Sequence, residues 1–211
     1  MANAKALTIL DNNGARTMKK NIAKLAIASA FATTLLMPVA NAADYAIDDK
    51  GAHASINFKI KHLGYSWLTG RFDTFGGKFT YDPANVSASK IEVNIDTSSI
   101  NSNHAERDKH LKGNDFLDVS AFANAKFVST SVTEKAAGKL AVAGVLTLHG
   151  VSKDIIIDAQ AVGEGKDPWG GYRAGFSGTT TIALTDFAIK MNLGPASTHV
   201  QLDLHIEGIK Q

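Results

Sequence analysis

One short segment, residues 103–110, holds the side chains whose types and spacing best suit catalytic or metal chemistry. It reads Asn-His-Ala-Glu-Arg-Asp-Lys-His. On a helix, His104 lies one turn from Asp108, and Glu106 lies one turn from His110, which is the spacing of metal ligands. The segment contains no His-Glu-x-x-His motif, and a third ligand would have to come from elsewhere in the chain. It therefore allows one hypothesis, a metal-dependent enzyme that uses this helix.

The same segment also carries the signals of a short surface helix with no chemical role. Asn103 can cap the helix, Glu106 completes a capping box, and Gly113 can end it, which predicts a helix over residues 104–112. Charge pairs one turn apart account for its polar residues, and Leu111 can anchor it. This interpretation is favoured, so no metal ligand is predicted here.

Other signatures of enzymes are missing from the sequence. There is no Gly-x-Ser-x-Gly nucleophile elbow, and the glycine-rich stretch 163–171 has Pro168 where a dinucleotide-binding loop needs its third glycine. There are no cysteines, which excludes disulfides and thiol catalysis. The sequence thus predicts no catalytic residue and no cofactor.

Alternation of apolar and polar residues with period two dominates the chain after Ala43. In the last such segment Val200, Leu202, Leu204 and Ile206 share one face, and similar alternation occurs around residues 54–60, 91–95, 140–148 and 155–161. Strands that are apolar on one side suggest antiparallel pairing, and a large sheet avoids exposed edges by closing. The pattern predicts an all-β fold, an extended eight-stranded antiparallel barrel with the short helix near one mouth.

The residues that face the inside of this barrel are of mixed size. Several are small, among them Gly144, Ala159 and Gly178, while aromatic residues crowd the region from Tyr65 to Tyr81. An eight-stranded barrel is just wide enough to be filled by side chains or to hold one elongated ligand. Because small residues leave room, the composition favours a cavity over a filled core.

The first 42 residues resemble an export signal. Lys19, Lys20 and Lys24 precede an uncharged apolar run, and Ala40-Asn41-Ala42 is a small-x-small cleavage site. We expect residues 18–42 to be a signal peptide cleaved after Ala42, with periplasmic export, no permanent membrane anchor, and residues 1–17 as an extension before the true start at Met18. Residues 43–211 then form a single domain with 17 Lys and Arg against 19 Asp and Glu, a balance that does not suit nucleic-acid binding.

Four motifs in the domain carry a resemblance to a known family. They are His62-Leu-Gly-Tyr-Ser-Trp-Leu68, the segment 103–111, Asp167-Pro-Trp-Gly-Gly171 with Arg173-Ala-Gly-Phe176, and Leu193-Gly-Pro-Ala-Ser197. Together they resemble the YceI-like family along essentially all of residues 43–211. The resemblance implies a lipocalin-like barrel whose apolar tunnel holds a polyisoprenoid or another long-chain lipid. It also implies binding without catalysis or a required cofactor, often in a homodimer.

Strand parity and aromatic position then predict which side chains line the tunnel. The predicted lining residues are Phe58, Ile60, Trp67, Phe72, Phe79, Phe127, Leu146, Ile157, Phe176 and Ile182. The leading hypothesis is a periplasmic lipid-binding protein that sequesters, transports or stores a long apolar chain. Two alternatives stay open at this point, the metal-dependent enzyme and a stress-related barrel that binds a protein partner without lipid cargo.

Overall fold

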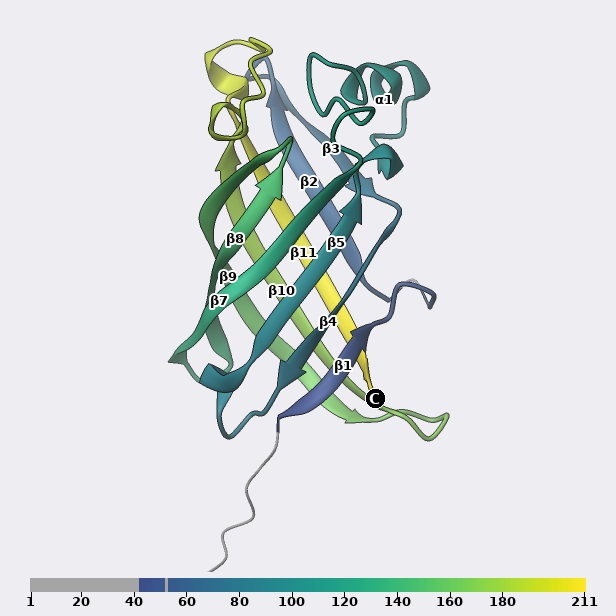
Figure 1. Ribbon diagram of the computed structural model, residues 1–211, viewed down its shortest axis with the longest axis vertical. Helices are drawn as coiled ribbons and strands as arrows, with labels where there is room; N and C mark the ends of the chain where they lie inside the picture. Colours follow the sequence, from purple (N-terminus) through teal and green to yellow (C-terminus); the bar gives the residue numbers. More distant parts are fainter. Residues whose placement is uncertain (1–41, 52) are drawn as a thin grey trace, which may run out of the picture. The chain divides into compact units, whose positions relative to one another are not determined.

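The structure, a computed structural model, describes residues 42–51 and 53–211 (Figure 1). The expected extension 1–17 and the expected signal peptide lie outside the described residues, apart from Ala42. No helix in the described part of the chain is long and apolar enough to span a membrane. The strands are β1 (Ala43–Ile47), β2 (Ser55–His62), β3 (Ser66–Phe72), β4 (Phe75–Tyr81), β5 (Lys90–Asp96), β6 (Ile100–Asn101), β7 (Asn124–Ala136), β8 (Lys139–Leu148), β9 (Val151–Lys166), β10 (Tyr172–Ala183) and β11 (His199–Lys210).

Four single-turn 3₁₀ helices and one α-helix complete the secondary structure of the described residues. The 3₁₀ helices are η1 (Val86–Ala88), η2 (Thr97–Ser99), η3 (Leu184–Phe187) and η4 (Pro195–Ser197), and the α-helix is α1 (Ala105–Leu111). The helix begins one residue later than the sequence predicts and ends one residue earlier. His104 rather than Asn103 caps it, since Asn103 has a left-handed backbone (φ 63°) and an N-cap residue needs an extended one.

Eight strands form a closed antiparallel barrel, as the sequence predicts. Their order around the barrel is β1-β4-β5-β7-β8-β9-β10-β11, and β1 pairs with β11 to close the ring. The three closing pairs run from Tyr45↔Lys210 to Ile47↔Gly208. Because the ring is closed, none of these eight strands presents a continuous unpaired edge to solvent. This favours the barrel for strands that are apolar on one face only.

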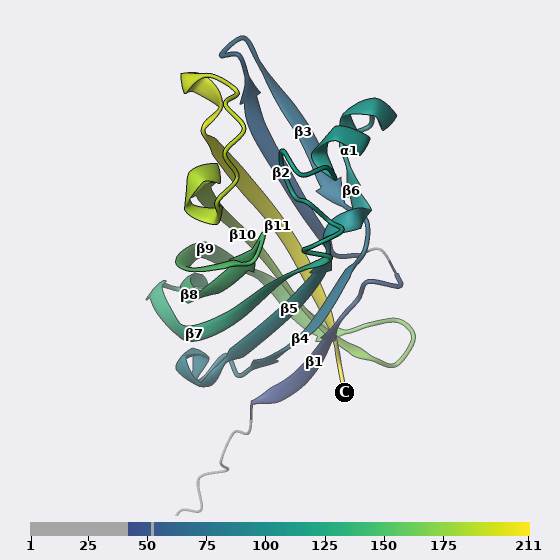
Figure 2. The same cartoon turned by 45° about the horizontal axis from the view of Figure 1, so that its top comes forward.

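Strand β11 has two partners along its second edge. Its C-terminal end pairs with β1, while residues Val200–His205 pair with β2. Strand β2 in turn pairs with β3, and β3 pairs with the short β6. The β2–β3 hairpin therefore continues the wall beyond the closed ring, and Figure 2 shows it rising at one end of the barrel between α1 and the segment that joins β10 to β11.

The wall of this upper end is not closed by backbone pairing. Strands β5 and β7 are paired only as far as Asp96↔Asn124, and from there β6 diverges to join β3. The gap is bridged at its base by Thr97, whose backbone N–H donates to Ala123 O and whose hydroxyl donates to Phe122 O (2.7 Å). Beyond that point the wall consists of α1 and the residues that follow it.

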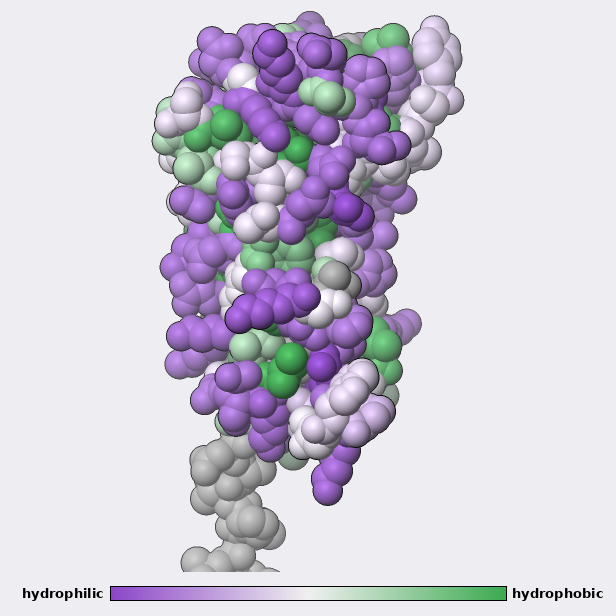
Figure 3. All heavy atoms as spheres, turned by 90° about the vertical axis from the view of Figure 1, so that its right-hand side faces the viewer, coloured by the Kyte–Doolittle hydropathy of each residue, from purple (hydrophilic) through white to green (hydrophobic). Residues whose placement is uncertain are grey.

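Strand parity places apolar side chains inside the barrel and polar ones outside. On β11, Leu202, Leu204 and Ile206 face inward, as the alternation predicts, while His205 on the opposite face is exposed. Figure 3 shows one outer face of the barrel, on which hydrophilic side chains predominate and hydrophobic ones are visible only in small separate patches.

A partly buried cluster of charges links the parts of the chain that meet at the lower end of the barrel, where β1 ends and the β9–β10 hairpin turns. Arg173 Nη1 lies 2.6 Å from Asp48 Oδ2 and 2.5 Å from Glu207 Oε1, and Arg173 Nε lies 2.8 Å from Asp167 Oδ2. His53 Nδ1 adds a contact of 2.9 Å to Asp48. Hydrogen bonds from His53 and Arg173 lower the pKa of Asp48 from 3.8 to about 2. The cluster thus joins three separate parts of the chain.

Replacing Asp48 by Asn tests this cluster. A carboxylate whose pKa is lowered by folding stabilises the fold above its unfolded-state pKa, and the contribution is lost as the pH falls through the folded-state value near 2. We expect the variant to lose roughly 2 kcal/mol of unfolding free energy at pH 7, and the difference to shrink as the pH approaches 2 in urea titrations. The exposed neighbour Asp49→Asn is the control, with a change within about 0.5 kcal/mol. Parallel pH curves for D48N and the unchanged protein would contradict the assignment.

Candidate functional site

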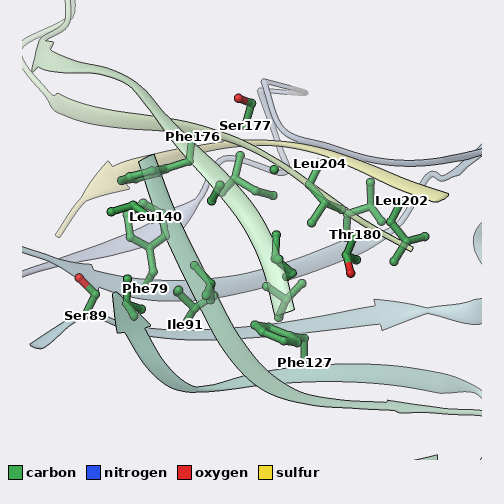
Figure 4. Close-up of a pocket in the computed structure, with 18 of the residues that line it drawn as sticks. Phe79, Ser89, Ile91, Phe127, Leu140, Phe176, Ser177, Thr180, Leu202 and Leu204 are labelled. Carbon is green, nitrogen blue, oxygen red and sulfur yellow. The ribbon is translucent and has the colours of Figure 1, made fainter. Parts of the chain in front are cut away.

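The interior of the barrel contains two apolar chambers arranged end to end. The lower chamber, inside the closed ring, has a volume of about 140 Å³ (Figure 4). Aliphatic and aromatic side chains from all eight ring strands and β2 form its wall, including Phe79, Phe127 and Phe176. Of the few polar residues in that wall, Ser89 Oγ is buried and has no hydrogen-bond partner among the described residues.

The upper chamber is larger, about 590 Å³, and lies where the wall is not closed by strand pairing. One side is made by β2 and β3, with Phe58, Ile60 and Phe72. The other sides come from segments outside the barrel strands, namely α1 with the residues after it, and the connection between β10 and β11. A volume of this size is in the range of small-molecule binding sites.

Four side chains line both chambers and form a neck between them. They are Ile56, Ile95, Leu146 and Leu202, from β2, β5, β8 and β11. All four are aliphatic, so an apolar chain that passes from one chamber to the other meets no polar group in the neck. The two chambers are therefore adjacent and share an aliphatic boundary, and a single continuous tunnel through them stays a prediction.

The polar groups of the site gather at the rim of the upper chamber. Lys61, His62, Arg107 and His110 all contribute to its lining. Arg107 Nε donates to Ser102 Oγ (2.7 Å), and His110 Nε2 lies 3.1 Å from Asp115 Oδ2. The site thus has a polar, solvent-facing rim that includes the Arg107 guanidinium, above an apolar interior.

Phenylalanine rings of the wall lie against glycines on other strands. A Cβ added to Gly144 would stand 2.5 Å from Phe127 Cζ and from Val128 O, and Gly208 and Gly70 are likewise covered by the rings of Phe79 and Phe58. The space next to Gly144 is therefore occupied by Phe127, contrary to the expectation that this small residue leaves room for a ligand. Ala159 and Gly178 do line the lower chamber.

The structure places nine of the ten predicted lining residues in the walls of the chambers. Those in the upper chamber are Phe58, Ile60, Phe72, Leu146 and Ile182, and those in the lower chamber are Phe79, Phe127, Leu146, Ile157 and Phe176. Their role in holding a ligand stays a prediction. Trp67 was placed wrongly, since it is half-exposed on the outer face of β3 opposite Lys61, and its neighbour Leu68 faces the chamber.

Sequence reasoning missed the lining residues that lie outside the barrel strands. The upper chamber is also lined by Leu111, Phe116, Leu117, Leu184, Ile189 and Leu193. None of these belongs to a segment with period-two alternation. The available signal was the presence of paired large apolar residues in segments without strand character, such as Phe116-Leu117 directly after the helix.

The helix residues of the metal hypothesis do not converge on one point. Asp108 Oδ1 accepts hydrogen bonds from the backbone N–H (2.7 Å) and hydroxyl (2.5 Å) of Ser102, and His110 is directed to Asp115. Burial of Asp108 opposes ionisation, but the Ser102 hydrogen bonds outweigh it and lower the pKa. Within residues 42–51 and 53–211, the one His/Asp/Glu trio with ligand atoms close together is Asp48, His53 and Glu207, and the Arg173 guanidinium already bridges its two carboxylates.

The fold and the site define a closed eight-stranded antiparallel barrel around apolar chambers, and comparisons with known proteins identify its family. A model of the YceI-like domain matches residues 45–208. A protein of Shewanella denitrificans described as a UPF0312 protein is 59% identical over 195 residues, which cover 92% of this chain and 100% of that protein. The chain belongs to the YceI-like domain family.

Two solved structures illustrate the likeness. The crystal structure of the Campylobacter jejuni YCEI protein is 31% identical with a TM-score of 0.65, and the match covers 72% of this chain and 90% of that one. A polyisoprenoid binding domain from Saccharophagus degradans has a TM-score of 0.58 at 19% identity, and the match covers 79% of this chain and 98% of that one. The second likeness shows a shared fold.

A substitution at Gly144 tests how tightly the chamber wall is packed. We expect Gly144→Val to destabilise the barrel by about 1–3 kcal/mol, because the new side chain meets the Phe127 ring and the Val128 carbonyl. Gly163→Ala on β9 is the control: nothing lies within 4 Å of its added Cβ, and its effect is expected to stay within about 1 kcal/mol. Urea titration measures both, and equal stabilities for the two variants would refute the packing argument.

Proposed function

We propose that this protein binds one long-chain apolar lipid of the polyisoprenoid kind in its two chambers and sequesters, transports or stores it in the periplasm. The observation that carries the proposal is that two apolar chambers lie next to each other and share the four aliphatic side chains of the neck. The expected export signal supports the compartment. The walls of both chambers are predominantly apolar, which suits the binding of a hydrocarbon chain.

The length of the site suits one long hydrocarbon chain in an extended conformation. Along β11 the wall extends from Ile206 to Val200, and it continues from the paired residue Ile60 to Leu63 at the hairpin. At about 3.3 Å per residue these nine steps span roughly 30 Å along the strands. With a tilt of about 40°, the span along the barrel axis is roughly 20–25 Å, which exceeds the ~15 Å hydrocarbon depth of one membrane leaflet.

The polarity of the two ends predicts how the lipid is oriented. The polar rim of the upper chamber, which includes Arg107, suits a polar or anionic head, while the lower chamber suits the distal end of the hydrocarbon. Each CH₂ moved from water into such a site contributes about 0.8 kcal/mol before ordering costs, so ten carbons contribute roughly 8 kcal/mol. The protein needs no special chemistry to hold such a cargo. The relative from Saccharophagus degradans, described as a polyisoprenoid binding domain, agrees with this assignment.

Lipid analysis of natively purified protein tests the proposal. We expect organic-solvent extracts of detergent-free protein to contain a long isoprenoid species at about one molecule per chain by mass spectrometry. An extract without lipid, from protein that is folded by circular dichroism, would overturn the proposal and favour the barrel that binds a protein partner.

A tryptophan in the neck tests whether the cargo occupies both chambers. We expect Leu202→Trp to block passage between the chambers, so that the variant retains only shorter chains or loses at least tenfold of its lipid, at a stability cost of about 1–3 kcal/mol. The matched control is Gln201→Trp, which adds the same ring to the outer face of the same strand. Full-length cargo at unchanged stoichiometry in a folded Leu202→Trp variant would show that the lower chamber is not used.

A further inference from the structure

The tip of the β2–β3 hairpin exposes large apolar side chains next to the mouth of the upper chamber. Leu63, Tyr65 and Trp67 are 58%, 89% and 53% exposed. Three of the seven large apolar residues that are exposed in the described part of the chain thus fall within five consecutive positions. Exposed apolar groups gathered in this way mark an interaction surface.

The backbone of the tip holds these side chains outward in a defined turn. Leu63 and Gly64 both have left-handed backbones, with φ of 53° and 84°, and the Tyr65 N–H donates to His62 O (3.0 Å) to close the turn. A left-handed conformation is unfavourable for leucine, so the turn keeps Leu63 exposed at a cost to local stability. The tip is also tied to the β10–β11 connection, because Ser197 Oγ donates to Lys61 O (2.5 Å).

Positive charge surrounds the exposed aromatic residues. Lys59 Nζ and Lys61 Nζ lie 5.2 Å and 5.7 Å from the centre of the Trp67 ring. Residues 55–72 contain no Asp or Glu, and neither do residues 187–202 of the adjoining segment, which adds the exposed Lys190. Tryptophan and tyrosine prefer the interface between water and lipid, and lysines near a bilayer surface are attracted to anionic headgroups.

The same hairpin forms part of the entrance to the cavity. Lys61, His62 and Leu63 line the upper chamber from one side, and Asn192, Leu193 and Gly194 line it from the other. Figure 2 shows the hairpin projecting beyond the barrel strands at this end. A surface that receives the exposed tip therefore also faces the mouth of the chamber.

We propose that the hairpin tip, residues 62–67, docks on a bilayer that contains anionic lipid, with Leu63, Tyr65 and Trp67 in the interfacial zone and Lys59, Lys61 and Lys190 against the headgroups. This inference rests on the proposed function, since it gives the cargo a path between chamber and membrane without exposure to water. An anionic bilayer fits better than a protein partner because one source supplies both the negative surface and the apolar cargo.

Binding to lipid vesicles tests the docking surface. In a Trp169→Phe background Trp67 is the sole tryptophan of the chain. We expect its emission to shift to shorter wavelength with phosphatidylglycerol-containing vesicles, and to shift little with phosphatidylcholine vesicles or at high salt. Flotation with the same vesicles measures the bound fraction without relying on fluorescence.

Variants then locate the surface, each made in the otherwise unchanged chain. Tyr65→Ser with Trp67→Ser is expected to weaken binding to the anionic vesicles at least tenfold in flotation, and Lys59→Gln with Lys190→Gln to remove the preference for anionic lipid. The matched control is Val162→Ser with Trp169→Ser, which removes an equally exposed apolar pair from the β9 strand and the β9–β10 hairpin. Equal loss in the control pair, or no vesicle binding by the unchanged protein, would overturn the proposal. So would a Trp67 shift that depends on protein concentration alone, since a second copy would then cover the tip.

Lipid extraction from the same variants separates this inference from the proposed function. Tyr65 and Trp67 lie outside both chambers, so their double variant is expected to retain cargo at the unchanged stoichiometry. Retained cargo together with absent vesicle binding in the unchanged protein would leave the carrier intact and refute docking. Vesicle binding by a protein that never holds lipid would refute the carrier and leave docking standing.

Discussion

The hydrogen-bonding of strand β11 is the constraint on which the rest of the structure depends. One edge of this strand pairs with β10 along its whole length, and the other edge is divided between β1 and β2. This division allows one strand both to close the barrel below and to carry the β2–β3 hairpin above. The Arg173 cluster lies near the point on β11 where the pairing partner changes from β2 to β1. Its member Glu207 lies between the two paired stretches of this edge.

Packing inside the ring determines how much of the interior stays open. The Phe58, Phe79 and Phe127 rings cover Gly70, Gly208 and Gly144, so large aromatic side chains use space that glycines of other strands provide. The lower chamber is consequently narrow, and most of the volume lies above the neck, where segments without strand structure form the wall. A narrow, closely packed lower chamber and a wider upper chamber together suit a flexible chain with a bulkier head.

The sequence predicts which side chains face inward where this depends on local alternation. It does not predict this where contacts between distant residues determine the orientation. The alternation of residues 200–206 predicts correctly which side chains face inward, because a strand in a barrel repeats every two residues. Trp67 and Leu68 are both large and apolar, so alternation alone cannot say which faces the cavity. The pairing of β3 with β2 decides it.

Prediction from the sequence has the same limit for helix α1 and for the wall of the upper chamber. The spacing of the acidic and basic residues on α1 indicates which side chains share a face, but the orientation of that face depends on contacts with Ser102 and Asp115 outside the helix. Likewise Phe116 and Leu193 belong to connecting segments whose side chains meet only when the barrel is formed. No periodic pattern in the chain could have assigned them to the cavity.

Because of the gap between β6 and β7, the width of the upper chamber does not depend on strand pairing alone. In a fully paired barrel, the path of the backbone wall is set by strand number and register, and a one-residue change of register moves every side chain of that strand to the other face. Here the wall of the upper chamber between these strands consists of α1 and the residues after it, and such connecting segments accept substitutions and insertions more readily than paired strands. Among proteins with this barrel, the width and shape of the upper chamber can therefore diverge while the strand framework remains unchanged.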